Sequence, residues 1–205
     1  MRISAQEALA RLREGNQRFV SGVRSIDSLL APIKRAELVA EQWPFAIVLG
    51  CSDSRVPAEI IFDQGLGDLF VIRVAGNIVA PSQVGSVEFA AERFGTRLVV
   101  VLGHSQCGAI GATIEEVRNA STKSPNLRSI VDRIRPAVET LLDTDLANDE
   151  QRLVQQAVRA NVRASADHLR HGSALLEQLI QNEGLVVVGA EYSLDTGAVD
   201  FFNGV

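Results

Sequence analysis

The chain has 205 residues, of which 46% are hydrophobic and 22% charged, a composition typical of a soluble globular protein and not of a disordered one. Its formal net charge is −5 and its basic residues are scattered, so neither nucleic acid nor an anionic membrane is an expected partner. Residues 1–7 lack the apolar block of a signal peptide and no apolar run has the length of a membrane span, which favours a cytoplasmic location.

The first residues predict a helix over residues 4–20 that begins with a capping box. Ser4 is the expected N-cap, and Glu7 follows three residues later, so each side chain can bond the other residue's backbone N–H. The apolar stripe of this helix consists only of Leu9, Leu12 and Phe19. Because the stripe is thin, we expect the helix to pack on a surface outside its own neighbourhood.

A second helix is predicted over residues 32–41, ahead of the first of three continuous apolar runs. These runs, residues 45–50, 69–74 and 98–102, do not alternate with polar residues, as is typical of strands buried on both faces of a parallel sheet. Residues 84–94 lie between the second and third runs and have helical periodicity. A strand, a crossover helix and a strand form a βαβ unit, which indicates a parallel sheet covered by helices.

The second half of the chain is predicted to be mainly helical before it returns to strands. Helices are expected over residues 109–117, 126–142, 149–171 and 173–183, with a kink or break at Pro136. Residues 185–189 and 198–202 flank a turn with Gly197 at a position of positive φ, which predicts a terminal hairpin.

The expected fold class is therefore α/β, with a mostly parallel central sheet flanked by helices, a C-terminal hairpin and an N-terminal helical arm. We expect residues 1–205 to form one domain, made of the arm (residues 1–44) and an α/β core (residues 45–205).

Polar residues that can bind a metal follow two of the predicted strands. Cys51 and Asp53 come after the first apolar run, while His104 and Cys107 come after the third. In a parallel sheet the carboxyl ends of strands lie at one edge, where open α/β folds place their ligands. Two thiolates, an imidazole and a carboxylate suit tetrahedral zinc. Because thiolates donate more electron density than imidazoles, we expect alkaline pH to favour the activity of such a site.

The role of Asp53 depends on Arg55, and the sequence leaves two arrangements open. If Asp53 binds the metal, the site has four protein ligands and is closed. If Arg55 takes the carboxylate in a bidentate ion pair, the fourth position is free for water, which zinc makes more acidic and Asp53 can orient.

Three simpler interpretations compete with a metal site. The two cysteines could simply be small hydrophobic residues buried in the core. Asp53 and Arg55 could form an ion pair at the surface without a role at a metal. A dithiol redox pair is the weakest interpretation, because the chain has no Cys-x-x-Cys motif.

Two motifs resemble the signatures of the β-class carbonic anhydrases. The first is Cys-Ser-Asp-Ser-Arg-Val-Pro over residues 51–57, and the second is Gly-His-Ser-Gln-Cys-Gly over residues 103–108. Further similar segments include Ala-Gly-Asn at residues 75–77, Gly-Ser-Val-Glu-Phe at 85–89 and Asn-Val-Arg at 161–163. The resemblance covers essentially the whole chain.

The resemblance implies zinc-dependent, reversible hydration of carbon dioxide to bicarbonate by attack of zinc-bound hydroxide. It assigns Cys51, His104 and Cys107 as zinc ligands, and the pair of Asp53 and Arg55 as the switch at the fourth position.

The resemblance also implies substrate-binding residues and a subunit arrangement. Gln42 matches a glutamine that bonds substrate oxygen, Phe70 and Phe89 match apolar walls of the cleft, and Gly108 offers a backbone N–H. The residue at position 89 is commonly Tyr in the family, so its hydroxyl is absent here. The implied assembly is a homodimer or a dimer of dimers with the cleft at the subunit boundary, and the N-terminal helix wrapped over the partner.

Two alternatives to carbon dioxide hydration stay open. Hydrolysis of carbonyl sulfide or carbon disulfide needs the same ligands on the same scaffold. A non-catalytic zinc-binding scaffold protein needs the metal ligands but neither Gln42 nor Arg55.

Overall fold

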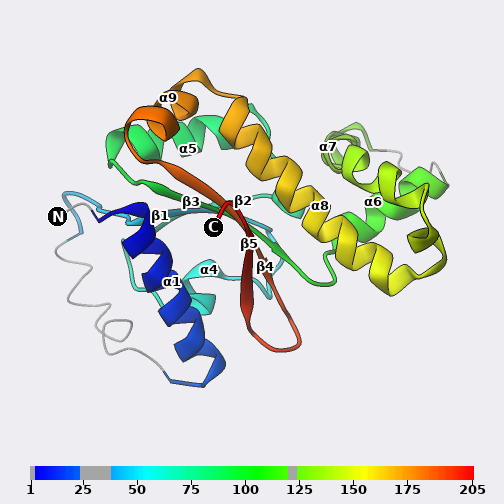
Figure 1. The fold of residues 1–205 in the computed structure, drawn as a ribbon, viewed down its shortest axis with the longest axis horizontal. Helices are drawn as coiled ribbons and strands as arrows, with labels where there is room; N and C mark the ends of the chain where they lie inside the picture. Colours follow the sequence, from blue (N-terminus) through cyan, green and yellow to red (C-terminus); the bar gives the residue numbers. More distant parts are fainter. Residues whose placement is uncertain (1–2, 24–37, 120–123) are drawn as a thin grey trace.

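The computed structural model describes residues 3–23, 38–119 and 124–205, and these form a five-stranded sheet with helices on both faces (Figure 1). The strands are β1 (Ala46–Gly50), β2 (Leu69–Arg73), β3 (Leu98–His104), β4 (Val186–Tyr192) and β5 (Val199–Asn203). Their order across the sheet is β2-β1-β3-β4-β5. Strands β1 to β4 are parallel to one another and β5 is antiparallel to β4, which confirms the mostly parallel sheet and the C-terminal hairpin.

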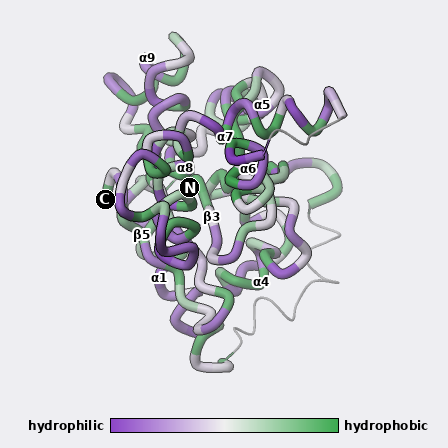
Figure 2. Tube along the Cα trace, turned by 90° about the vertical axis from the view of Figure 1, so that its right-hand side faces the viewer, coloured by the Kyte–Doolittle hydropathy of each residue, from purple (hydrophilic) through white to green (hydrophobic). Residues whose placement is uncertain are grey.

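The α-helices are α1 (Ala5–Val20), α4 (Ala58–Ile61), α5 (Pro81–Arg93), α6 (Gly108–Arg118), α7 (Pro125–Leu142), α8 (Glu150–His171) and α9 (Ala174–Asn182). Two 3₁₀ turns, η1 (Ala75–Asn77) and η2 (Asp145–Asn148), complete the described elements. Hydrophobic and hydrophilic stretches alternate along the helices, as expected where one side of a helix faces a core (Figure 2). Among the described residues, no helix is both long and apolar enough to cross a membrane.

The two central strands are buried along their whole length. Every residue of β1 and β3 is buried, which explains why their sequences do not alternate. Helices α5, α8 and α9 cover one face of the sheet, while α1 and α4 cover the other (Figure 1). A third apolar cluster joins α6, α7 and α8 next to the carboxyl ends of β1 and β3.

Helix α1 begins with the predicted capping box and packs on its own chain. The side chain of Ser4 accepts a bond from Glu7 N, and the Glu7 carboxylate accepts one from Ser4 N at 2.8 Å. Ala5, Ala8 and Leu12 are buried against the sheet and α4. The helix therefore buries two alanines, Ala5 and Ala8, that the predicted apolar stripe did not include.

Two other expectations about helices have different outcomes. The sequence predicts a kink or break at Pro136. Helix α7 runs through Pro136 as one helix, so the predicted break is wrong. The proline removes the donor for the Asp132 carbonyl, and both residues lie on the exposed side of the helix, where such a loss is tolerated best. The helix predicted over residues 32–41 lies largely outside the described residues, and its described end, residues 38–40, is turn and bend. The terminal turn has Gly197 at a φ of +76°, as predicted.

Candidate metal centre

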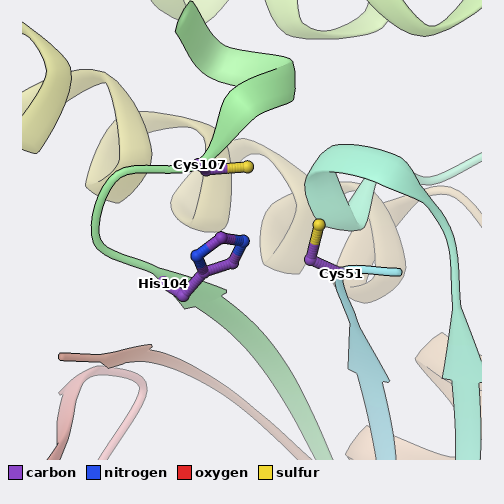
Figure 3. A group of neighbouring side chains, drawn as sticks. All are labelled: Cys51, His104 and Cys107. Atoms are coloured by element: carbon purple, nitrogen blue, oxygen red, sulfur yellow. The ribbon is translucent and has the colours of Figure 1, made fainter. Parts of the chain in front are cut away.

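The sheet brings the ends of β1 and β3 together. Gly50 and Leu102 are partners in the register of these strands, so Cys51, just after β1, and His104, the last residue of β3, leave the sheet at the same edge. Cys107 is the N-cap of α6, which begins after a short turn. All three side chains point toward one another in Figure 3.

One ligand atom from each of Cys51, His104 and Cys107 lies within 4.8 Å of the other two, and all three residues are buried. The His104 Nδ1 atom is 2.9 Å from the carbonyl oxygen of Ser105, which assigns the ring proton to Nδ1. Nε2 then carries a lone pair, and it is a buried atom with no hydrogen-bond partner in the described part of the chain. Because buried polar atoms are seldom left unpaired, this lone pair fits a metal ligand, and two thiolates with one imidazole fit zinc.

The two thiols share a proton in the metal-free chain. A hydrogen bond from the Cys107 thiol lowers the pKa of Cys51 to about 4. The same bond, together with burial, raises the pKa of Cys107 above its usual range. The opposite shifts favour a single thiolate in the pair, so a metal would displace one shared proton instead of two.

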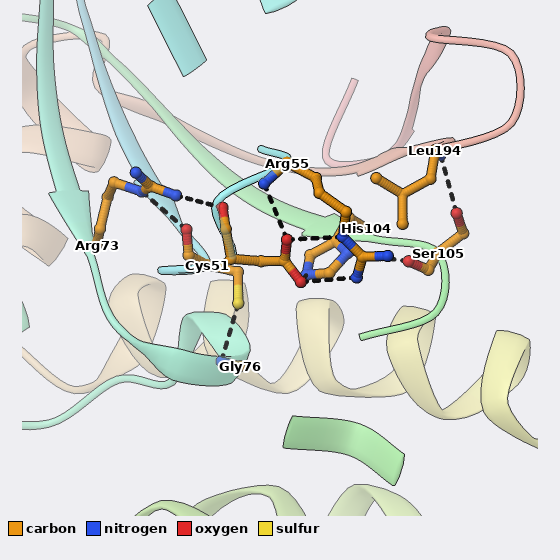
Figure 4. Close-up of polar contacts among 8 residues, drawn as sticks. Cys51, Arg55, Arg73, Gly76, His104, Ser105 and Leu194 are labelled. Atoms are coloured by element: carbon orange, nitrogen blue, oxygen red, sulfur yellow. Dashed lines mark hydrogen bonds and ion pairs between the residues drawn. The ribbon is translucent and has the colours of Figure 1, made fainter. Parts of the chain in front are cut away.

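The turn that carries His104 and Cys107 is fixed by the end of the hairpin. Ser105 N donates to the Tyr192 carbonyl at 2.9 Å. Ser105 Oγ accepts from Leu194 N at 2.9 Å, as Figure 4 shows. Gln106 has a φ of +56°, which turns the chain sharply between His104 and Cys107.

Asp53 lies beside the cluster with both carboxylate oxygens bonded to Arg55. Arg55 Nε donates to Oδ1 at 2.9 Å and Nη2 donates to Oδ2 at 2.8 Å, while the backbone N–H of Arg55 donates to Oδ1 at 3.0 Å. These bonds hold the pKa of the Asp53 carboxyl well below its usual range. The nearer oxygen of Asp53 is 3.9 Å from His104 Nε2, too far for a hydrogen bond.

Arg73 is a residue that holds the site and to which the sequence analysis gave no role. It ends β2, and its guanidinium donates to the carbonyls of Cys51 at 2.9 Å and Asp53 at 2.5 Å (Figure 4). The sequence feature that could have identified Arg73 is the position of a charged residue at the end of an apolar strand.

The proposed substrate-binding residues do not lie together within one chain. Gly108 is exposed at the first position of α6, next to Cys107, where helix N–H groups lack acceptors within the helix. Gln42 and Phe89 instead line a pocket of about 460 Å³ that none of the cluster residues lines. Gln42 precedes the amino end of β1, whereas Cys51 follows its carboxyl end.

Phe70 belongs to the same distant group. Its ring centroid is 6.3 Å from that of Phe89 and 6.0 Å from that of Phe94, which also lines the pocket with Gln42. Phe89 is 52% exposed, so this aromatic surface is open in the single chain.

Comparison with known proteins agrees with this geometry. The family model described as "Carbonic anhydrase" matches residues 46–199. Carbonic anhydrase 2 of Mycobacterium tuberculosis is 38% identical over 191 residues, covering 91% of this chain and 87% of the relative. The β-carbonic anhydrase CafA of Aspergillus fumigatus has a TM-score of 0.77 at 24% identity, with 98% of this chain and 91% of that chain covered.

A chain from the crystal structures of two tetrameric β-carbonic anhydrases of Sordaria macrospora shares the fold as well, with a TM-score of 0.73 at 24% identity and coverage of 85% of this chain and 88% of that chain. The sequence motifs, the fold and the matched region thus agree, and the chain belongs to the β-class carbonic anhydrase family.

Proposed function

We propose that this chain catalyses the zinc-dependent, reversible hydration of carbon dioxide to bicarbonate and a proton. The observation that carries the proposal is the buried cluster of Cys51, His104 and Cys107 with the carboxylate of Asp53 beside it but bonded to Arg55. Three protein ligands with an open fourth position are typical of catalytic zinc, whereas structural zinc takes four protein ligands.

When bound, zinc would supply the Lewis acid that lowers the pKa of a water ligand. The chain's own groups have separate tasks around it. Asp53 is an ionised acceptor beside the cluster, so it is suited to take a hydrogen bond from the nucleophile and orient it. Arg55 keeps Asp53 from acting as a fourth ligand, and this pairing supports the open arrangement of the two that the sequence allowed.

We propose that Gln42, Phe70 and Phe89 serve the metal centre of a second copy of the chain. Within one chain Gln42 lies beyond the opposite end of β1 from Cys51, so it cannot contact a substrate at its own cluster. The exposed ring of Phe89 provides an apolar surface that a partner would cover. Gly108, next to Cys107, would offer its N–H to the substrate of its own chain.

The assembly that follows is a homodimer or a dimer of dimers. The tetrameric relatives from Sordaria macrospora support such an assembly. Since α1 buries Ala5, Ala8 and Leu12 against its own chain, any contact of this helix with a partner would use its exposed side; most of the rest of the proposed N-terminal arm (residues 1–44) follows α1 in the chain. We also propose a cytoplasmic location, where free cysteines such as Cys51 and Cys107 stay reduced.

Two alternative functions use the same site. Hydrolysis of carbonyl sulfide or carbon disulfide would differ only in the shape of the cleft. A non-catalytic zinc-binding scaffold is less well supported, because a structural site needs no carboxylate held beside the metal by an arginine.

Zinc content, measured together with stopped-flow hydration of carbon dioxide at about pH 7 and about pH 8.5, tests the proposal. We expect bound zinc and faster turnover at the higher pH. A chain without metal would refute the proposal, and bound metal without turnover would favour the scaffold. Repeating the assay with carbonyl sulfide separates the two activities, because a hydrolase would process that substrate faster. Cys51→Ser is the matched negative control, expected to lose both metal and activity.

A further inference from the structure

The turn η1 lies against the metal centre in an unusual backbone conformation. Gly76 and Asn77 both have positive φ, +69° and +43°. A Cβ at Gly76 would lie 2.7 Å from Ile134 Cδ1 and 3.1 Å from Ala109 Cβ, so another residue would be strained by the positive φ and would also crowd these two side chains. Two successive left-handed residues need other groups to hold them in place.

The turn presents a backbone donor to a proposed metal ligand. The N–H of Gly76 donates to Cys51 Sγ over 3.4 Å (Figure 4). A hydrogen bond to a metal-bound thiolate withdraws electron density from the sulfur, which leaves a bound metal a stronger Lewis acid. This bond therefore acts against the electron donation expected from two thiolates.

Two polar residues of α8 hold the turn from the opposite side. Asn161 Nδ2 donates to the Gly76 carbonyl at 2.8 Å, and Ser165 Oγ donates to the Asn77 carbonyl at 3.1 Å. They are four residues apart, so they lie on one side of the helix, and they are only 2% and 6% exposed. The apolar neighbour Val162 already packs α8 on the sheet, so packing alone does not require these two polar groups.

We propose that Asn161 and Ser165 are positioning residues that tune the metal through Cys51. By fixing the carbonyls of Gly76 and Asn77 they fix the orientation of the Gly76 N–H toward the sulfur. The inference rests on the proposed function, because it assumes that Cys51 is a metal ligand. It joins two segments of the chain, residues 75–77 and 161–165, that have no other role in the proposed reaction.

The test uses the full chain with cobalt(II) in place of zinc, together with the variants Asn161→Ala and Ser165→Ala. Without the bonds from α8, the hydrogen bond from the Gly76 N–H to Cys51 Sγ should be weakened. The energy of the sulfur electrons then rises, so the thiolate-to-cobalt charge-transfer band should move to longer wavelength in both variants. Ser165→Thr keeps the hydroxyl and should restore the parent spectrum. In the metal-free chain, the Gly76 amide proton should exchange faster in both alanine variants than in the parent.

Activity gives a second readout of the zinc-loaded chain. A weaker Lewis acid moves the midpoint of the pH–rate profile upward, so the loss of rate should be about 10-fold or more at pH 7 and smaller at alkaline pH. A purely structural defect would lower the rate equally at both.

Asn16→Ala is the matched control. Asn16 is also a buried asparagine that donates to a turn carbonyl, that of Gly197 at 2.9 Å, but on the other face of the sheet. An unchanged cobalt spectrum in folded Ser165→Ala would overturn the inference, and so would an equal shift in Asn16→Ala. If the parent chain binds no cobalt, the proposed function fails instead, whereas the amide-exchange result for Gly76 still decides whether α8 positions the N–H.

Discussion

Asp53 and Arg55 are joined by two parallel hydrogen bonds of 2.9 Å and 2.8 Å between guanidinium and carboxylate. The side chain of Arg55 is 51% exposed and that of Asp53 is 18% exposed, so the pair is held mainly by its bidentate geometry. The arginine thus determines where the carboxylate points, a few ångströms from the histidine of the cluster.

Arg55→Ala should release Asp53 to bind the metal and close the site. We expect zinc content to be retained and carbon dioxide hydration to fall about 10- to 100-fold, the usual effect of losing a group that orients the site. The double variant Asp53→Ala with Arg55→Ala should be no slower than Asp53→Ala alone, because the arginine then has no carboxylate to hold. A full rate in Arg55→Ala would contradict the role of the pair.

Acid titration should distinguish the pair from two independent groups. Because Arg55 lowers the pKa of Asp53 in the folded chain, the pair stabilises the fold fully above the unfolded pKa, near 3.8, and this contribution is lost as the pH falls through the lower folded value. The stability difference between parent and Arg55→Ala should therefore be present at neutral pH and vanish in strong acid. Urea unfolding at several pH values measures it, and a difference that grows on acidification would refute the assignment.

Metal removal should leave one thiolate per chain. The hydrogen bond between the thiols lowers the pKa of Cys51 and raises that of Cys107, so we expect the pair to carry a single negative charge at neutral pH. The chain has two cysteines, so ultraviolet thiolate absorbance counts them directly. Cys107→Ala removes the donor, and the absorbance at pH 7 should then fall. Two thiolates at pH 7 in the metal-free parent would contradict the shared proton.

Mixing two inactive variants should restore activity if Gln42 serves a second copy. Gln42→Ala lacks the substrate contact and Cys51→Ser lacks the metal, so each alone should be nearly inactive. A mixed dimer has one site with both groups intact, and random exchange of subunits should recover about a quarter of the parent rate. No recovery, with mixed dimers demonstrated by mass spectrometry, would mean that Gln42 does not act across the subunits.

Gly103→Ala should destabilise the chain by overpacking. A Cβ at Gly103 would lie 2.5 Å from Val162 Cγ2, so α8 would have to move away from β3. Overpacking of this kind costs about 1–3 kcal/mol of the free energy of unfolding. The added change Val162→Ala makes room for the new methyl group, and urea unfolding should show that the double variant loses less stability than the sum of the two single variants.

Most of the fold can be predicted from local patterns of apolar and polar residues in the sequence. The continuous apolar runs that became β1 and β3 are recognisable because both faces of these strands are buried. The grouping of Cys51 with His104 follows from the same pattern, since residues after neighbouring parallel strands meet at one edge. The break expected at Pro136 did not occur, because the sequence did not reveal that this turn of α7 faces solvent.

The contacts that depend on the direction of a side chain could not be predicted from the sequence. Asp53 is equally near in sequence to Cys51 and to Arg55, and only the backbone path after β1 decides which way it turns. Likewise, Arg73, 22 residues after Cys51, reaches its carbonyl only because β2 and β1 are paired. Motif spacing identifies the donors of a site, whereas the bonds between them require the assembled sheet.

Most bonds that shape the metal centre end on main-chain atoms. Arg73 binds the carbonyls of Cys51 and Asp53, and His104 binds the carbonyl of Ser105. A carbonyl or N–H group is present whatever side chain the residue carries. Exposed side chains around the site can therefore change without altering its geometry, so related sequences can diverge widely while the cluster keeps its shape.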